Sequence, residues 1–166
     1  MDNIHDPVFE RYIFEKRETI NEHISVYSGI RNQFGIMSRY IYLTLDNGDI
    51  IGSFGIEGGG EKHQFDSGET NDMHISIDDN YQGYGFTKIM MKHLIDKIYE
   101  DIPEMVDRGD QMLFIDADAS DGFWDNIGME ESKRYGYNRN PRYARREGAG
   151  YEKYITINNL YKFATS

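Results

Sequence analysis

The most informative stretch of this chain is Met73-His-Ile-Ser-Ile-Asp-Asp-Asn-Tyr-Gln-Gly-Tyr-Gly-Phe-Thr-Lys-Ile-Met-Met-Lys-His-Leu-Ile95. Its first five residues alternate apolar and polar side chains, which predicts a strand with one buried face. Two glycines, Gly83 and Gly85, interrupt this alternation. From Phe86 onward the apolar residues recur every three or four positions, which predicts an amphipathic helix. The stretch therefore predicts a strand, a glycine turn and a helix in immediate succession.

A turn with two glycines directly before a helix has a specific physical use. Glycine has no Cβ, so a ligand can approach the backbone closely. The first N–H groups of a helix have no partner within the helix, and the helix dipole adds positive potential there. Such a turn favours an anion, for example a phosphate or a pyrophosphate. The alternative is a plain connection whose glycines only make the bend.

The spacing of the glycines excludes two common phosphate-binding motifs. The chain has no Gly-x-x-x-x-Gly-Lys-Ser/Thr, and no third glycine stands three residues after Gly85, as a dinucleotide fingerprint requires. The run Gln82-Gly83-Tyr84-Gly85-Phe86-Thr87 instead resembles the acetyl-CoA-binding motif of the GNAT superfamily of N-acyltransferases, Arg/Gln-x-x-Gly-x-Gly/Ala. Thr87 stands where the family has Gly or Ala, so it must fit where the backbone packs closely on the pyrophosphate.

A second segment resembles the same family. Asp121-Gly-Phe-Trp-Asp-Asn-Ile-Gly-Met129 is predicted to form a short helix that ends at Gly128. It is similar to the second GNAT signature, in which a short helix carrying Phe-Tyr ends in Gly-Phe. Phe123-Trp124 and Gly128-Met129 stand at those places. The two resemblances occur in the family's order and together cover about residues 73–130.

The N-terminal region is predicted to be mainly helical. Asp6-Pro7 is a helix-start signal, a capping side chain followed by proline at the first helical position. A loose amphipathic pattern follows, so we expect a helix from about Pro7 to Glu22. Residues 24–34 are ambiguous, since they either continue the helical region or hold a short strand at Ile24–Tyr27.

Apolar runs in the middle and at the end of the chain predict strands. The runs at 40–45 and 50–56 flank Asn47-Gly48, a pair that favours a type I′ hairpin turn. Further strands are expected at 112–115 and 151–157. With the resemblance, these elements lead us to expect a single α/β (α+β) domain over residues 1–166. It would have a GNAT-like mixed, mostly antiparallel central sheet, flanked by about four helices.

Composition limits the functions that remain. The chain has 166 residues and no cysteine, which excludes disulfides, thiolate catalysis and Cys-based zinc sites. We expect a soluble cytoplasmic protein, because no run fits a signal peptide or a membrane span. The net charge of −11 argues against nucleic acid as a partner and suits a cationic acceptor. The histidines lack ligand spacing, so no metal is implied.

The resemblance implies an N-acetyltransferase, which moves an acetyl group from acetyl-CoA to a primary amine. The acceptor would be a protein lysine, an N-terminus or a small amine, and the attack would be direct, in a ternary complex. In the family, backbone N–H groups of the strand before the turn hold the pantetheine and polarise the thioester carbonyl. Ile75, Ser76 and Ile77 would be those residues here, and residues 82–87 would bind the pyrophosphate.

The sequence offers several alternatives for the groups that would transfer protons. Three candidates for the base are His74, which titrates near neutrality, and the carboxylates of Asp72 and Glu57. For the acid, the family often has a tyrosine where this chain has Trp124, whose indole cannot act as an acid. Either a nearby tyrosine, Tyr135 or Tyr137, replaces it, or solvent does. Trp124 would then pack against the pantetheine or in the core.

Two other classes of function fit parts of the pattern. A non-catalytic module that binds acyl-CoA or a protein partner on the same fold is favoured by the missing family tyrosine. An unrelated nucleotide-binding domain would prefer ATP or NAD to CoA. Binding of these ligands and turnover with a panel of amines distinguish the three.

Overall fold

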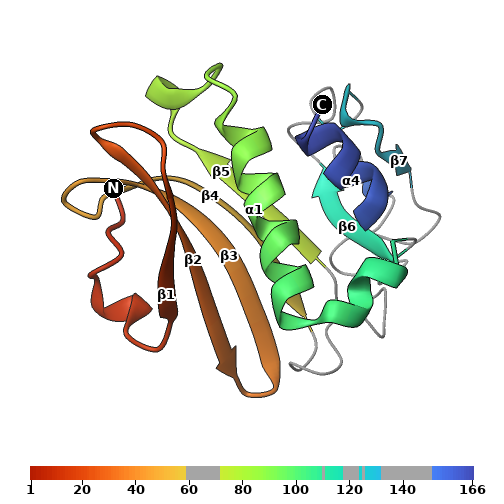
Figure 1. Cartoon of the computed structure of the whole chain (residues 1–166), viewed down its shortest axis with the longest axis horizontal. Helices are drawn as coiled ribbons and strands as arrows, with labels where there is room; N and C mark the ends of the chain where they lie inside the picture. Colours follow the sequence, from red (N-terminus) through yellow and green to blue (C-terminus); the bar gives the residue numbers. More distant parts are fainter. Residues whose placement is uncertain (59–71, 110, 118–123, 125, 132–150) are drawn as a thin grey trace.

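The computed structural model describes residues 1–58, 72–109, 111–117, 124, 126–131 and 151–166. The described elements form one sheet with its α-helices on one side (Figure 1). In chain order, with η marking 3₁₀ helices, they are η1 (Pro7–Phe9), β1 (Ile13–Thr19), β2 (Ile24–Gln33), β3 (Ile36–Leu45), β4 (Ile50–Gly58), β5 (Asp72–Ile77), η3 (Asp79–Tyr81), α1 (Phe86–Asp101), η4 (Pro103–Asp107), β6 (Met112–Ala117), β7 (Glu130–Glu131), β8 (Tyr151–Thr156) and α4 (Ile157–Ala164).

The sheet is mixed and mostly antiparallel, which confirms that prediction. Its 8 strands follow the order β1-β2-β3-β4-β5-β6-β8-β7. All neighbouring pairs are antiparallel except β5 and β6, which are parallel because α1 crosses between them. The predicted strand, glycine turn and helix are thus β5, the turn and α1, at the centre of the molecule.

Helix α1 covers one face of the sheet. Its buried stripe consists of Phe86, Met90, Met91, Leu94, Ile95 and Ile98. This stripe packs on apolar side chains that alternate along β3, β4 and β5, and these are Ile41, Leu43, Phe54, Ile56 and Met73. Each fully buried aliphatic or aromatic side chain contributes roughly 1.5–3 kcal/mol relative to exposure, so this interface supplies much of the stability.

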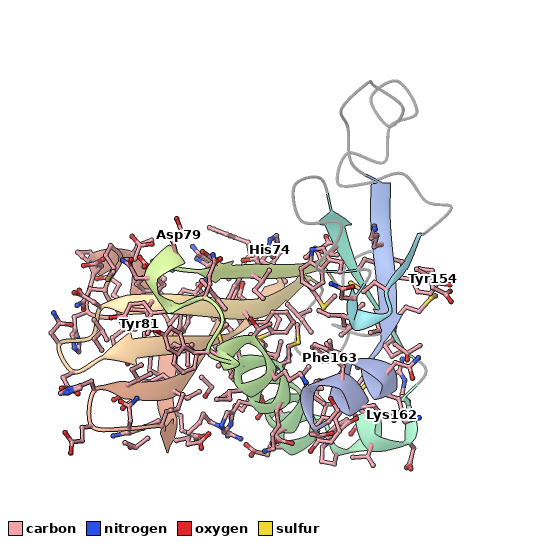
Figure 2. All side chains as sticks on the ribbon, turned by 90° about the horizontal axis from the view of Figure 1, so that it is seen from above. His74, Asp79, Tyr81, Tyr154, Lys162 and Phe163 are labelled. Carbon is pink, nitrogen blue, oxygen red and sulfur yellow. The ribbon has the colours of Figure 1, made fainter. Side chains whose placement is uncertain are left out.

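Helix α4 follows β8 directly and was not predicted. The hydroxyl of Thr156 accepts a hydrogen bond from the backbone N–H of Asn159 at 3.2 Å, which caps the helix start. Tyr161 contacts α1, because its hydroxyl donates to Asp96 at 3.1 Å and its ring lies 6.1 Å from that of Tyr99. Figure 2 shows α1 and α4 on the same side of the sheet.

The predicted helix from Pro7 to Glu22 is wrong. Only η1, at Pro7–Phe9, is helical, and the Asp6 carboxylate accepts from the N–H of Asn3 at 2.9 Å instead of capping a helix. The chain then becomes strand β1, which pairs with β2. The physical reason is tertiary: the aromatic rings of this region cover Tyr42 on the sheet, and they are Phe9, Tyr12 and Phe14. Of the ambiguous residues 24–34, Ile24–Gln33 form strand β2, which pairs with β1 and β3.

The predicted hairpin is confirmed, but its turn is of another type. A type I′ turn requires positive φ at both central residues. Here Gly48 alone is positive, at 91°, and the N–H of Leu45 bonds to the carbonyl of Asp49 at 2.8 Å. The loop therefore has three residues, with glycine in the left-handed position, and a bulge shifts the register between Leu43 and Thr44.

The described residues contain two α-helices, α1 and α4, fewer than the four or so that were predicted. One of the missing helices is the predicted N-terminal one, whose residues form strand β1 instead. Of the predicted helix at 121–129, Trp124, Asn126 and Ile127 are helical, and Gly128 ends the turn with a φ of 95°. No described helix has both the length and the apolar character needed to cross a membrane.

Candidate functional site

The turn between β5 and α1 places bare backbone at the start of a helix. Gly83 and Gly85 have φ values of 84° and 80°, a left-handed conformation that strains any residue with a Cβ. Helix α1 begins at Phe86, and no described side chain caps its first turn. Its first N–H groups are therefore available to a ligand, and the helix dipole favours an anion there.

The Gln82 side chain ties this turn to the end of β5. Its amide nitrogen donates to the carbonyl of Ile77 at 3.3 Å and to the carboxylate of Asp79 at 3.1 Å. The Asp78 carboxylate accepts from the N–H of Asn80 at 3.0 Å, which closes the 3₁₀ turn η3. The protein therefore sets the position of the glycine turn by its own hydrogen bonds.

A pocket of about 500 Å³ joins the turn to β5. It contains every predicted cofactor-binding residue except Tyr84 and Trp124, and its described lining is Ile75, Ser76, Ile77, Tyr81, Gln82, Gly83, Gly85, Phe86 and Thr87. A volume of this size is within the range of small-molecule and cofactor sites. The structure thus brings together residues from β5, from the turn and from the first helical turn of α1.

Strands β5 and β6 diverge beside this pocket. Six residue pairs join β4 to β5, whereas one pair, Asp72 with Phe114, joins β5 to β6. Beyond Asp72 the side of β5 that faces β6 has no strand partner among the described residues. The Ile77 carbonyl on this side accepts from Gln82. Backbone groups without a strand partner form hydrogen bonds readily with an extended ligand.

The three candidate bases lie together on the face of the sheet opposite α1. Glu57 on β4 is directly opposite Asp72 on β5. The His74 Nε2 atom is 3.7 Å from the Glu57 Oε2 atom, an ion-pair distance but too long for a hydrogen bond. Figure 2 shows His74 on the side of the sheet away from α1. All three residues lie close to the point where β5 separates from β6.

A fourth residue of this cluster, Tyr40 on β3, escaped the sequence reasoning. Its hydroxyl donates a hydrogen bond to Glu57 Oε1 at 3.0 Å. Burial, followed by the charge of Glu57, raises the pKa of Tyr40 well above its ordinary value. The pairing of β3 with β4 places Tyr40 opposite Gly55, two residues from Glu57, but the bulge between Leu43 and Thr44 hides this register from the sequence.

The remaining predicted residues lie elsewhere or outside the described part. Tyr84 is 68 % exposed and stacks on Phe86, with ring centroids 5.8 Å apart. Trp124 is 2 % exposed and belongs to the hydrophobic core. Tyr135, the predicted acid, lies outside the described residues.

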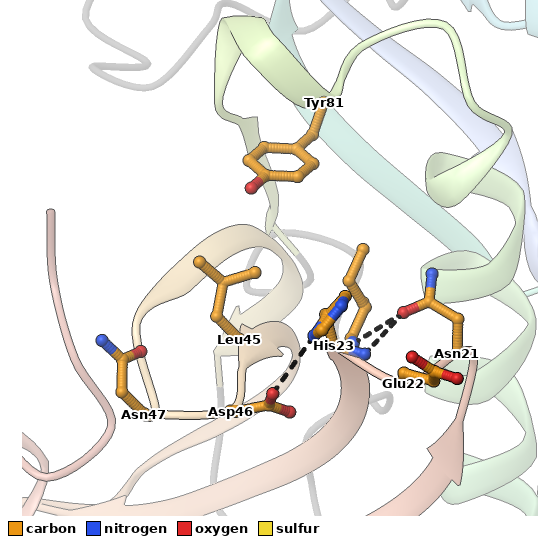
Figure 3. Close-up of a pocket in the computed structure, with 8 residues that line it drawn as sticks. Asn21, Glu22, His23, Leu45, Asp46, Asn47 and Tyr81 are labelled. Atoms are coloured by element: carbon orange, nitrogen blue, oxygen red, sulfur yellow. Dashed lines mark hydrogen bonds and ion pairs between the residues drawn. The ribbon is translucent and has the colours of Figure 1, made fainter.

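A second, larger pocket lies next to the first and has different chemistry. It measures about 690 Å³ and is formed at two strand connections, one between β1 and β2 and one between β3 and β4 (Figure 3). His23 and Asp46 meet there at 3.3 Å. Tyr81 lines both pockets. None of the described residues that line this second pocket is a predicted site residue.

Comparison with known proteins adds a likeness in structure but none in sequence. No family model and no curated protein matches the sequence. A solved structure, an acetyltransferase of the GNAT family from Staphylococcus aureus Mu50, is similar with a TM-score of 0.47 and 14 % identity. The similarity covers 72 % of this chain and 68 % of that chain. With a TM-score below 0.5, this likeness establishes neither the family nor the activity.

Proposed function

We propose that this chain transfers an acetyl group from acetyl-CoA to a primary amine by direct attack in a ternary complex. The observation that carries the proposal is the pocket of about 500 Å³ that joins the glycine turn to the open side of β5. A CoA thioester needs these two features side by side, because it carries a pyrophosphate at one point and an extended amide-containing arm beyond it. The glycine turn suits the pyrophosphate, and the open side of β5 suits the extended arm.

Each part of the pocket has a role in this proposal. The N–H groups at the start of α1 bind the pyrophosphate, and β5 binds the arm. N–H groups within Ile75–Ile77 polarise the thioester carbonyl as fixed dipoles. The amine loses a proton to the cluster on the opposite face and attacks the carbonyl carbon, after which the C–S bond breaks. The acidic side chains of that face, with the net charge of −11, support a cationic acceptor.

One observation favours a second candidate, a non-catalytic module that binds acyl-CoA. Trp124, which stands where the family often has a tyrosine, is buried in the core and has no acidic proton to give. Release of free CoA thiol from acetyl-CoA in the presence of amines distinguishes the two candidates, because the module binds acetyl-CoA without releasing thiol.

The cofactor is tested by thermal unfolding with acetyl-CoA, CoA, ATP and NAD. Acetyl-CoA at about 100 times its Kd adds about 2.7 kcal/mol to stability. For a chain of this size we expect a rise in Tm of about 5–10 °C with either CoA species, and none with ATP or NAD. Gly85→Glu removes this rise, because a carboxylate in the turn repels the pyrophosphate.

The chain offers a matched control at Gly35, in the β2–β3 turn. Gly35 has a φ of 75° and, like Gly85, has no atom within 4 Å of an added Cβ. Gly35→Glu therefore introduces the same charge and the same backbone strain far from the pocket, and should keep the full rise. A wild type whose Tm does not respond to acetyl-CoA or CoA would overturn the proposal, and a response to ATP or NAD alone would favour the nucleotide-binding alternative.

A further inference from the structure

The residues of β5 that alternate on the face opposite α1 form a polar row. They are Asp72, His74 and Ser76, and Asp78 continues the alternation directly after the strand. His74 and Ser76 are exposed, and Asp72 and Asp78 are half-buried. A carboxylate therefore stands at each end of the row. At about 3.3 Å per residue, the Cα atoms of His74 and Asp78 are about 13 Å apart.

A pocket of about 520 Å³ lies at the Asp78 end of this row. Ser53 on β4 and Ser76 on β5, which are directly opposite one another in the register, both line it, so we call it the serine pocket. Asp2 and Asp78 belong to the same lining, and the described lining has no side chain of lysine, arginine or histidine. Asp78 Oδ1 accepts from the N–H of Asn80 at 3.0 Å, which leaves Oδ2 for a ligand. Hydroxyl and carboxylate oxygens without a basic neighbour favour a cation.

The serine pocket adjoins the pocket proposed for acetyl-CoA. Ser76 lines both of them. In the proposed function the thioester carbonyl lies against Ile75–Ile77, so the two pockets meet beside the place of acetyl transfer. An acceptor that reacts beside His74 therefore has space for further atoms in the direction of Asp78.

Part of the surface between the two ends of the row is aromatic. A Cβ added at Gly55 would overlap the Tyr40 ring, so this ring lies against bare backbone. The rings of Tyr40 and His74 are nearly parallel, 21° apart in plane, with centroids separated by 6.5 Å. Gly55 stands between Glu57 and Ser53 on β4, so the Tyr40 ring lies between the near end and the serine pocket. Such a ring offers an apolar surface to methylene groups.

The near end has a buried hydroxyl that lacks a partner. Glu57 is opposite Asp72, and on its other side it is opposite Ser38. Ser38 is 0 % exposed, and its Oγ atom has no hydrogen-bond partner among the described residues. An unpaired buried hydroxyl costs stability, and an ammonium group bound beside Glu57 would supply a donor. Both ends of the row therefore suit an ammonium group.

We propose that the acceptor is an aliphatic diamine or polyamine, and that the serine pocket binds the ammonium group that is not acetylated. The inference rests on the proposed function, whose acceptor it specifies. One nitrogen reacts beside His74, and the methylene groups cross the Tyr40 ring. The second nitrogen donates hydrogen bonds to Asp78, Ser53 and Ser76. The products are the monoacetylated diamine and the CoA thiol.

The length of the row sets the length of the acceptor. The second nitrogen lies between the levels of Ser76 and Asp78, about 7–13 Å from the level of His74. Eight methylene groups in an extended chain separate two nitrogens by about 11 Å, whereas four separate them by about 6 Å. A chain of about eight methylene groups therefore reaches the serine pocket, and a chain of four does not.

Two pairs of amines test this subsite, 1,8-diaminooctane with n-octylamine and 1,4-diaminobutane with n-butylamine. Their Kd values are measured by calorimetry on protein saturated with CoA, which has no acetyl group to transfer. We expect 1,8-diaminooctane to bind about ten-fold more tightly than n-octylamine, the effect of one hydrogen-bonded charged group. The advantage of 1,4-diaminobutane over n-butylamine should not exceed the statistical factor from its two equivalent amino groups.

Asp78→Asn removes the charge and keeps an oxygen that accepts from Asn80. It should abolish the advantage of 1,8-diaminooctane while changing the Kd of n-octylamine little. The matched control is Asp46→Asn, which removes the same charge from the larger pocket that Asp46 forms with His23, and it should keep the advantage. With acetyl-CoA the effect of Asp78→Asn should appear in KM and not in kcat, because Asp78 is remote from the reacting atoms.

The outcomes separate this inference from the proposed function. Equal binding of the two eight-carbon amines by the wild type would overturn the inference and leave acetyl transfer intact. An advantage that Asp78→Asn retains, or that Asp46→Asn abolishes, would also overturn it, because the second nitrogen would then lie elsewhere. If the diamine binds as expected but receives no acetyl group from acetyl-CoA, the proposed function is refuted and the serine pocket keeps its ligand.

Discussion

The two faces of the same sheet differ in chemistry although they come from alternate residues of the same strands. Toward α1, β4 presents Phe54 and Ile56, both 0 % exposed. Toward the other face, β4 presents Gly55 and Glu57, and β5 presents the half-exposed His74. The first face supplies buried apolar area and the second supplies hydrogen bonds and charges. Adjacent residues therefore have different tasks, and a shift of register by one residue would exchange them.

The side chains that lie on the second face change in character from one end of the sheet to the other. Over β2 and β3 the N-terminal segment covers Tyr42 with aromatic rings, while α1 takes no part there. Over β4 and β5 the polar cluster of Tyr40, Glu57 and His74 begins. The rings thus form an apolar border on one side of the cluster. A border of this kind lowers the local dielectric constant and strengthens the charge interactions beside it.

The largest expected effect separates the two faces by adjacent residues of β4. Phe54→Ala leaves a cavity in a fully buried site and should reduce the free energy of unfolding by about 3–5 kcal/mol. Ser53→Ala, one residue earlier on the opposite face, should change it by no more than about 0.5 kcal/mol. Urea unfolding followed by circular dichroism measures both. Equal losses in the two variants would contradict the division between a structural and a chemical face.

A smaller effect tests how the Tyr40 ring packs on Gly55, on the second face. Gly55→Ala adds a methyl group that displaces Tyr40, so we expect a loss of about 1–3 kcal/mol from overpacking. In a Tyr40→Ala background the same change should cost less, because the ring that it displaces is gone. The double-mutant cycle gives the coupling energy between the two positions. If the effects of Gly55→Ala and Tyr40→Ala are additive, Gly55 does not determine where the Tyr40 ring lies.

The smallest expected effect concerns the surface link between the sheet edge and α1. Arg17, in the bulge of β1, donates to the Glu100 carboxylate at 2.5 Å and 2.6 Å. This bond lowers the pKa of Glu100, so the folded protein holds the proton less tightly than the unfolded chain. The stabilisation is therefore present above the ordinary glutamate pKa of about 4.3 and is lost as pH falls through the folded pKa.

Glu100→Gln measures that link. Since the Glu100 side chain is 50 % exposed, solvent screens the pair, and we expect a loss of no more than about 1 kcal/mol at neutral pH. The difference between variant and wild type should vanish in acid, in urea unfolding at a series of pH values. Glu104→Gln, at an exposed carboxylate on η4, is the charge control and should show no such pH-dependent difference. A difference that persisted in acid would exclude the ion pair as its cause.

Sequence reasoning was most successful where a pattern is local. The alternation in β5, the glycines of the turn and the stripe of α1 each involve residues close in the chain, and all three elements formed as predicted. Residues 75–77 and the turn residues, predicted together as a cofactor site, line one pocket. Tyr84 and Trp124 departed from that set because their exposure depends on what packs around them.

Sequence reasoning failed where distant segments decide the outcome. Residues 13–19 have a weak helical pattern, but pairing with β2 and the rings over Tyr42 made them a strand. Thr156 is a good helix-capping residue, yet α4 was missed because its stripe is short and follows a strand without a break. The bulge after Leu43 shifts the β3–β4 register, so counting from the turn does not place Tyr40 over Gly55.

The sequence by itself determined the central strand, glycine turn and helix, because backbone conformation and side-chain periodicity act over a few residues. It also named Glu57, His74 and Asp72 as separate candidates for one role. Only the tertiary structure decided that these three meet, that Tyr40 joins them, and that β5 separates from β6 beside them. The reason is physical: contacts across strands depend on register, and register is set by burial of the opposite face over the whole sheet.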